Sequence, residues 1–437
     1  MTPRRSRGVL EAGFLACLFA TAIAFGGTEP VVWAGVKFTL FLFTALSIWI
    51  LREQVATLPW RWFGVLGAFL VAQALVLQAW GQRVSESLTD FLVYVAAFSL
   101  AAALAAAPAA RARLVAGLIT LGAAEAVYGL AQELASWQQI LGIEKIYYTA
   151  QATGTYVNPN HFSGLLEMIL PLALATAAWQ WDRARSRDGE SGRAAAVFFA
   201  AVALLIAAGI FASHSRMGIV SAVAGAALAA SLWTFAADGH QRKMRAAVLA
   251  GSLAATALLG LWLGPEPVVA RFRQASDDYL SRITLWRESM ALVWARPLFG
   301  AGWGAYPHLY PQVQATQLEF AVEHAHNDYL ELATEFGIPG AALLVALAAG
   351  VVARALRMVW RGLEDRTSYY ALGAAGGIAA LGVHSLADFN LRLPANALIF
   401  SALLGFAWAA ATPLGREASP GAPGALDFAA SEKERRA

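Results

Sequence analysis

Residues 194–213 read AAAVFFAAVALLIAAGIFAS, an apolar run without a charged residue. A helix needs about 20 mostly apolar residues to cross a bilayer, so this stretch alone predicts a membrane-spanning helix. Eleven further stretches are of the same kind. Together the predicted spans are roughly 9–26, 31–51, 61–80, 88–108, 112–132, 161–180, 194–213, 217–236, 246–264, 338–356, 368–386 and 395–412. A membrane barrel would show alternating segments of about ten residues, so we predict an all-α polytopic integral membrane protein with about 12 transmembrane helices.

The composition of the 437-residue chain excludes two broad classes of protein. Hydrophobic residues make up 58% of the chain and charged residues 14%, whereas soluble domains run at about 45–50% and 25%. A disordered protein would need low hydrophobicity and high charge. The single cysteine, Cys17, excludes an intramolecular disulfide framework and a zinc–cysteine cluster.

The positions of Lys and Arg orient the chain in the membrane, although the net charge is only +3. Cytoplasmic connections carry an excess of these residues, and most of the 32 basic residues fall on one side when the N-terminus is cytoplasmic. Both termini are then expected in the cytoplasm, and Lys37 falls within a span. The outside receives Arg83, Lys145, Arg216, Arg271, Arg273, Arg282, Arg287, Arg296 and Arg392.

The spans divide the chain into four parts. Residues 1–264 form transmembrane helices 1–9, and residues 338–412 form helices 10–12. The first span resembles a signal peptide but has a longer apolar run, so we expect a retained anchor. Residues 413–437 read as a disordered cytoplasmic tail. Residues 265–337 form a long outside loop that is rich in Trp and Tyr, and loops of this length are usually functional or disordered.

Two histidines lie near the end of this loop, in the stretch EHAHNDYLEL that covers residues 323–332. Asp328 and Glu331 resemble a helix-starting capping box, Gly337 is a plausible helix stop, and Pro339 opens the next span. His326 would then precede a helix N-terminus, where backbone N–H groups favour an anion and disfavour imidazolium. This location suits a base. The alternative is that His324 and His326 are interfacial polar residues. A metal site is not expected, because no carboxylate or cysteine cluster completes one.

Among the arginines on the outside, Arg216 is a candidate for anion binding, whereas solvation or pairing with lipid phosphate is the favoured interpretation of Arg282 and Arg287. Arg216 occupies a very short turn between two spans, where the positive-inside rule disfavours it, and guanidinium binds phosphate in a bidentate manner. Arg282 and Arg287 belong to a segment in which Ile283, Trp286 and Met290 recur at helical spacing. This spacing indicates an amphipathic helix on the membrane surface. Snorkelling to lipid headgroups is the alternative for Arg216.

The remaining polar motifs have structural interpretations. Asn158, Asn160 and His161 open the sixth span, with Asn160 as the expected helix cap. The glycine-rich stretch 300–304 follows no βαβ pattern, so a close-packed turn is expected rather than a nucleotide site. Ionisable groups within the spans are read as interhelical polar contacts; they are Lys37, Glu125 and Glu167.

Taken together, these motifs resemble the O-antigen ligase and polymerase superfamily over nearly the whole chain. The similar elements are the turn at 26–30, Asn158-Pro159-Asn160-His161, Ser215-Arg216, Arg282 four residues before Trp286, and His326-Asn327 followed by Gly337 and Gly340. The resemblance implies a GT-C-type membrane glycosyltransferase in the bacterial inner membrane, with its active site facing the periplasm. It also implies short amphipathic helices in the large periplasmic loop.

For a ligase, the resemblance implies transfer of O-antigen polysaccharide from undecaprenyl pyrophosphate to a sugar of the lipid A–core. His326 would be the general base, and Arg216 and Arg282 would bind the donor pyrophosphate. The resemblance implies neither a metal nor another cofactor. Membrane lipids are expected as partners, and nucleic acid is not. Supporting roles fall to Asn158, Asn160, His161, Arg287, His324 and Asn327.

Three other functions remain open at this stage. The superfamily contains O-antigen polymerases and protein O-oligosaccharyltransferases, and the latter usually carry extra sequence after the twelfth span. A transporter of lipid-linked sugars would place its polar groups near the middle of the membrane, whereas the distinctive groups here fall at its outer surface. We therefore favour a metal-independent, inverting ligase.

Overall fold

The computed structural model describes residues 3–79, 87–186, 189–237, 239–247, 250–251, 275–315 and 321–412. The described chain is almost entirely helical, and β1 (Gln139–Ile140) and β2 (Ile143–Glu144) form one short antiparallel hairpin. The helices are α1 (Pro3–Ile23), η1 (Phe25–Gly27), α2 (Pro30–Ile50), α3 (Arg52–Val55), α4 (Trp60–Ala79), α5 (Ser87–Ala105), α6 (Pro108–Leu134), α7 (Pro159–Ser186), α8 (Gly189–Ala212), α9 (Arg216–Phe235), α12 (Ala275–Ala295), α13 (Tyr306–Leu309), η2 (Tyr310–Gln312), α14 (Asp328–Trp360), α15 (Arg366–His384), η3 (Asn390–Arg392) and α16 (Pro394–Ala410).

The predicted polytopic α-helical membrane fold is confirmed. Within the described residues, nine helices are long and apolar enough to cross a membrane, and α16 is a shorter apolar helix. Together with α15 they account for every predicted span except the ninth. That span, 246–264, lies largely outside the described residues, as does the predicted tail at 413–437.

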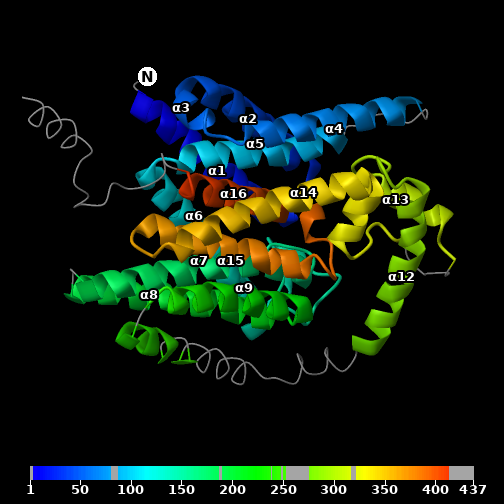
Figure 1. The fold of residues 1–437 in the computed structure, drawn as a ribbon. Coiled ribbons are helices and arrows are strands. Elements are labelled where there is room, and N and C mark those ends of the chain that lie inside the picture. The colour runs from blue at the N-terminus through cyan, green and yellow to red at the C-terminus, as the bar shows by residue number, and fades with distance from the viewer. Residues whose placement is uncertain are drawn as a thin grey trace, which may run out of the picture.

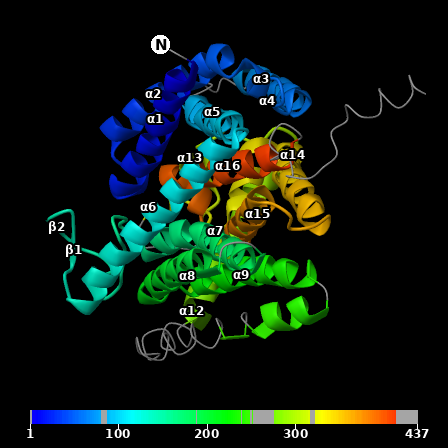
Figure 2. The same cartoon turned by 90° about the vertical axis from the view of Figure 1, so that its left-hand side faces the viewer.

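Helix α15 occupies the interior of the bundle. It packs against α7, α9, α14 and α16, and Figures 1 and 2 show it with α7 between α14 and the pair α8 and α9. Small residues permit this close packing, as is usual between membrane helices. A Cβ added to Gly377 would lie 2.2 Å from the carbonyl oxygen of Met168, and one added to Gly225 would lie 2.5 Å from that of Gly376.

The ionisable groups inside the spans mostly connect helices, as predicted. Lys37 of α2 pairs with Asp90 of α5 at 2.6 Å. Glu167 of α7 lies 2.9 Å from His384 of α15. Glu125 of α6 differs, because it accepts a hydrogen bond from Thr155 in the loop that precedes α7.

Helix α14 is broken by Gly337, which confirms the predicted helix stop. Gly337 has φ 69° and ψ 172°, a backbone conformation that favours glycine. A Cβ there would lie 2.6 Å from the carbonyl oxygen of Leu298. The glycine-rich turn packs against this break, because the Gly302 N–H donates to the Glu335 carbonyl at 2.8 Å. The predicted close-packed turn is therefore confirmed.

Helices α12 and α13 cover one end of the bundle (Figure 1). Their buried side chains form a small core of their own, which includes Leu285, Leu292 and Tyr306. The buried face of α12 differs from the predicted apolar face of Ile283, Trp286 and Met290, because Met290 is 36% exposed. Ser289 lies on the buried face instead, because its hydroxyl shares a hydrogen bond of 2.7 Å with the Tyr306 hydroxyl. Helix α12 therefore packs on its own loop through a face that hydropathy alone did not indicate.

Candidate functional site

The predicted base, His326, lies directly before α14 at the end of the bundle that α12 covers. Its backbone φ is 47°, which is uncommon outside glycine. Its Nδ1 lies 3.4 Å from Oδ1 of Asp388, in the loop between α15 and α16. The His326 side chain is 37% exposed, whereas that of Asp388 is 1% exposed. The imidazole is thus partly exposed, and its Nδ1 faces a buried carboxylate.

Asp388 was not predicted, yet it holds the site together. The Asn160 side chain donates to its Oδ2 at 2.7 Å, and the Phe389 N–H donates to its Oδ1 at 2.9 Å. His161 Nε2 lies 3.9 Å from Oδ1. Burial alone would raise the pKa of Asp388, but the imidazoles of His326, His161 and His384 lower it well below its usual value. The site therefore contains a fixed anion beside His326.

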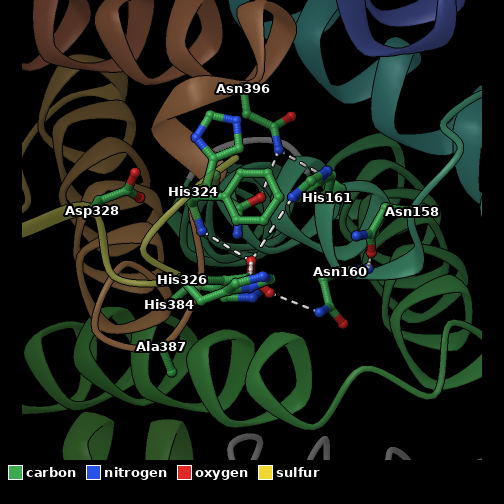
Figure 3. Close-up of polar contacts among 12 residues, drawn as sticks. Asn158, Asn160, His161, His324, His326, Asp328, His384, Ala387 and Asn396 are labelled. Carbon is green, nitrogen blue, oxygen red and sulfur yellow. Dashed lines mark hydrogen bonds and ion pairs between the residues drawn. The ribbon is translucent and has the colours of Figure 1, made fainter. Parts of the chain in front are cut away.

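Three of the predicted histidines gather around the Phe389 ring. His324 stacks on this ring at 4.3 Å between centroids. His326 and His161 approach it edge-on at 4.8 Å and 4.6 Å. Figure 3 shows the three imidazoles grouped together although they come from different parts of the chain. Aromatic contacts of this geometry restrict ring rotation, so Phe389 positions the imidazoles.

The start of α14 is fixed to the loop that carries Asp388. The N-cap is Asn327 rather than Asp328, because the Asn327 side chain accepts the Leu330 N–H at 3.0 Å and donates to Leu386. Asp328 is buried instead and accepts a hydrogen bond of 2.8 Å from the Ser385 hydroxyl. The predicted capping box of Asp328 and Glu331 is therefore wrong, and Glu331 instead accepts the Ala325 N–H. The two residues that follow His326 both fix its position relative to Asp388.

The start of α7 also differs from the prediction. The Asn158 side chain accepts the Asn160 N–H at 2.8 Å, so Asn158 performs the capping that was expected of Asn160. The Asn160 side chain is left to bind Asp388. A cap is a local interaction and Asp388 is distant in sequence, so helix-cap preference alone could not distinguish these two roles.

Helix α12 brings Arg282 to the same loop. The Arg282 guanidinium donates to the carbonyl of Ala387, the residue before Asp388. One turn later the Trp286 indole donates to the carbonyl of Ala325, the residue before His326, at 3.0 Å. Arg282 therefore contacts the residue before Asp388, while Trp286 of the same helix contacts the residue before His326. Arg287, by contrast, is exposed on α12.

Arg216 is the first residue of α9, where Ser215 is the N-cap. Helix α9 meets α7 close to the site, because a Cβ added to Gly218 would lie 2.2 Å from Ser163 Oγ. Ser163 in turn donates to the Asn160 carbonyl. The backbone of Arg216 is thus within about one helical turn of the segment that binds Asp388.

Sequence reasoning missed two further members of the site. Asp388 stands in an unremarkable loop, and only its tertiary neighbours distinguish it. His384 is fully buried in α15, and its Nδ1 contacts Glu167. Its signal was available, because an ionisable residue within a predicted span is a candidate for function. Among the residues that the structure describes, no group of three His, Cys, Asp or Glu side chains has the arrangement of a metal site.

The fold and the site together define a multi-pass membrane protein with a histidine–carboxylate pair and arginines at one end of its helices. Residues 200–345 match the family model described as O-antigen ligase. The match covers about a third of the chain, and it confirms the predicted resemblance to the O-antigen ligase and polymerase superfamily. It indicates a membrane enzyme of the glycosyltransferase type. A search of curated proteins gives no significant match.

Proposed function

We propose that the protein is an O-antigen ligase of the bacterial inner membrane, with the site in the periplasm. In this proposal it transfers O-antigen polysaccharide from undecaprenyl pyrophosphate to a hydroxyl of lipid A–core. The observation that carries the proposal is the contact of 3.4 Å between His326 Nδ1 and Asp388 Oδ1, with Arg282 bound to the adjacent Ala387 carbonyl. The family match supports the general class.

The pair suits a general base. Asp388 can fix the orientation of the imidazole and stabilise the imidazolium that forms when His326 takes a proton. The ring nitrogen that does not face Asp388 is then free to accept the proton of an acceptor hydroxyl. The partial exposure of His326 gives a bulky glycan access to that nitrogen.

The donor supplies a leaving group that needs charge stabilisation. In the proposed step the acceptor oxygen bonds to the anomeric carbon, and the bond from that carbon to the phosphate oxygen breaks. The proton passes to His326, and undecaprenyl pyrophosphate leaves with the bonding electrons. Arg282 and Arg216 would stabilise the developing negative charge, because preorganised cations lower such a barrier. One direct displacement inverts the anomeric centre.

Transfer by the purified protein in lipid nanodiscs tests this proposal. The protein would receive undecaprenyl-pyrophosphate glycan with lipid A–core, with a pilin peptide, or with donor alone, each with and without a chelator. We expect transfer to lipid A–core with inverted stereochemistry, unchanged by the chelator. Chain growth from donor alone would identify a polymerase, and glycosylated peptide would identify a protein glycosyltransferase. Retained stereochemistry would contradict direct displacement.

A further inference from the structure

A cavity beside the His326–Asp388 pair is lined by His324 and does not include either member of the pair. It has a volume of about 160 Å³. Its walls come from the starts of α2, α5, α14 and α16 and from the turn before α13, and they include Trp33, Asp90, Trp303, Glu331 and Arg392. Cavities for drug-sized ligands are larger, about 300–1,000 Å³, so this one fits a single small ring.

Three aromatic side chains, Trp33, Tyr94 and Trp303, form part of the cavity wall. Trp33 and Tyr94 stack with their ring centroids 6.1 Å apart, and Trp303 lies 6.2 Å from Tyr94. Arg392 covers the Trp303 ring at 4.1 Å. Aromatic faces bind flat, partly apolar rings, while their polar edges and neighbours bind hydroxyl groups. The apolar faces and equatorial hydroxyls of a pyranose match such a surface.

The charges around the cavity are paired with one another. Asp90 accepts from Lys37 at 2.6 Å and from the Trp33 indole at 3.2 Å. Arg392 contacts Glu331 at 3.1 Å and Glu335 at 2.6 Å. A phosphate would need a cation that is not already paired. The cavity therefore favours an uncharged polyhydroxylated ring over a phosphorylated one.

One residue of the cavity wall, Arg392, carries buried hydrogen-bond donors without a partner within the described residues. Arg392 is buried, and its Nη2 makes no hydrogen bond there. A buried polar group normally has a partner, and one without a partner needs an explanation. A hydroxyl of a bound ligand would supply the acceptor that this nitrogen lacks.

We propose that this cavity binds one uncharged hexopyranose of a saccharide substrate, beside the sugar that reacts at His326. The proposal rests on the proposed function, because it assumes a glycan substrate. His324 lines the cavity and stacks on Phe389, and Phe389 also contacts His326. The cavity and the base are therefore connected through two aromatic rings, those of His324 and Phe389.

Saccharide binding to the full-length protein in nanodiscs tests the cavity separately from catalysis. The probes are delipidated core oligosaccharide and free repeat-unit oligosaccharide without pyrophosphate, each titrated by calorimetry. The variants are Trp33→Leu and Asp90→Asn. The matched control is Trp49→Leu on the same helix, because Trp49 is 86% exposed. We expect at least one variant to weaken binding tenfold or more and the control to bind like wild type.

The two probes identify the source of the sugar. Loss of core binding assigns the cavity to the acceptor, and loss of repeat-unit binding assigns it to the donor glycan. In transfer assays the same variants should raise KM for that substrate more than they lower kcat. His326→Ala should still bind the oligosaccharide, because it lies outside the cavity.

Each outcome has a definite meaning. If wild type binds neither probe, or if both variants fold and bind like wild type, the cavity is not a saccharide site. If Trp33→Leu does not fold, Asp90→Asn alone decides. If wild type binds saccharide through the cavity but transfers none, the cavity stands and the proposed function fails.

Discussion

Two histidine–carboxylate pairs lie on either side of Phe389, and their surroundings differ. His324 contacts Glu331 at 2.9 Å, and His326 faces Asp388 at 3.4 Å. Glu331 also contacts Arg392 at 3.1 Å and accepts the Ala325 N–H. Asp388 instead accepts from an amide side chain and a backbone N–H.

The difference shows that the other partners of a buried carboxylate determine how much of its charge is available to the neighbouring histidine. Glu331 also pairs with the buried Arg392 guanidinium, so its charge is shared between Arg392 and His324. Asp388 accepts from two uncharged donors, the Asn160 amide and the Phe389 N–H, and its charge faces His326. The His326–Asp388 pair therefore suits proton transfer, and the His324–Glu331 pair suits fixation of the chain.

Removal of each imidazole in turn should give the largest difference in activity between the two pairs. His326→Ala should lower kcat by about 100-fold to 10,000-fold, the usual contribution of a general base. His324→Ala should retain far more activity, because it loses only a positioning contact. Product formation by purified variants measures this, with thermal unfolding as the control for folding. Equal losses in the two variants would contradict the separation of roles.

Neutral isosteres of the two carboxylates give the next largest expected effect. Asp388→Asn should lower kcat by about 100-fold or more, because the amide cannot stabilise imidazolium and can select the wrong tautomer of His326. Glu331→Gln should affect kcat less and thermal stability more, since it leaves the buried Arg392 charge less compensated. Kinetics and thermal unfolding of both variants test this. A larger kcat loss in Glu331→Gln would reverse the assignment.

Substitutions of the two arginines of α12 should have a smaller effect, which we expect on KM for the donor. Arg282→Lys should raise KM for the lipid-linked donor by about tenfold, because lysine cannot reproduce the planar guanidinium fork. Arg287→Lys is the matched control on the same exposed helix and should behave like wild type. A change in acceptor KM alone would show that Arg282 does not serve the donor.

The pH dependence of stability gives the smallest expected effect. The pKa of Asp388 is lower in the folded protein than its usual value, so ionised Asp388 favours folding at neutral pH. This contribution is fully present above the unfolded-state pKa of about 3.9 and is lost as the pH falls further. The stability difference between wild type and Asp388→Asn should thus be larger at about pH 6 than below about pH 4. Thermal unfolding across this range tests it, and a difference that grows on acidification would contradict the sign.

Local sequence patterns predicted much of the site but not its centre. The helix break at Gly337 was predictable because glycine alone readily adopts its backbone angles. The caps were misplaced by one or two residues, because Asn158 and Asn160, like Asn327 and Asp328, are equally good caps in isolation. Their roles depend on which side chain reaches the loop after α15. Asp388 itself carried no local signal.

The sequence by itself determined the membrane fold, because apolar length and the sorting of basic residues are properties of single segments. It also indicated His326, Arg216 and Arg282 as exceptional residues on the side that the basic residues predict to be outside. Only the tertiary structure decided which carboxylate faces which histidine, since Asp388, Asn160 and His326 lie far apart in the chain. The packing of α7, α14 and α15 brings them together, and long-range packing of this kind leaves no periodic trace in any one segment.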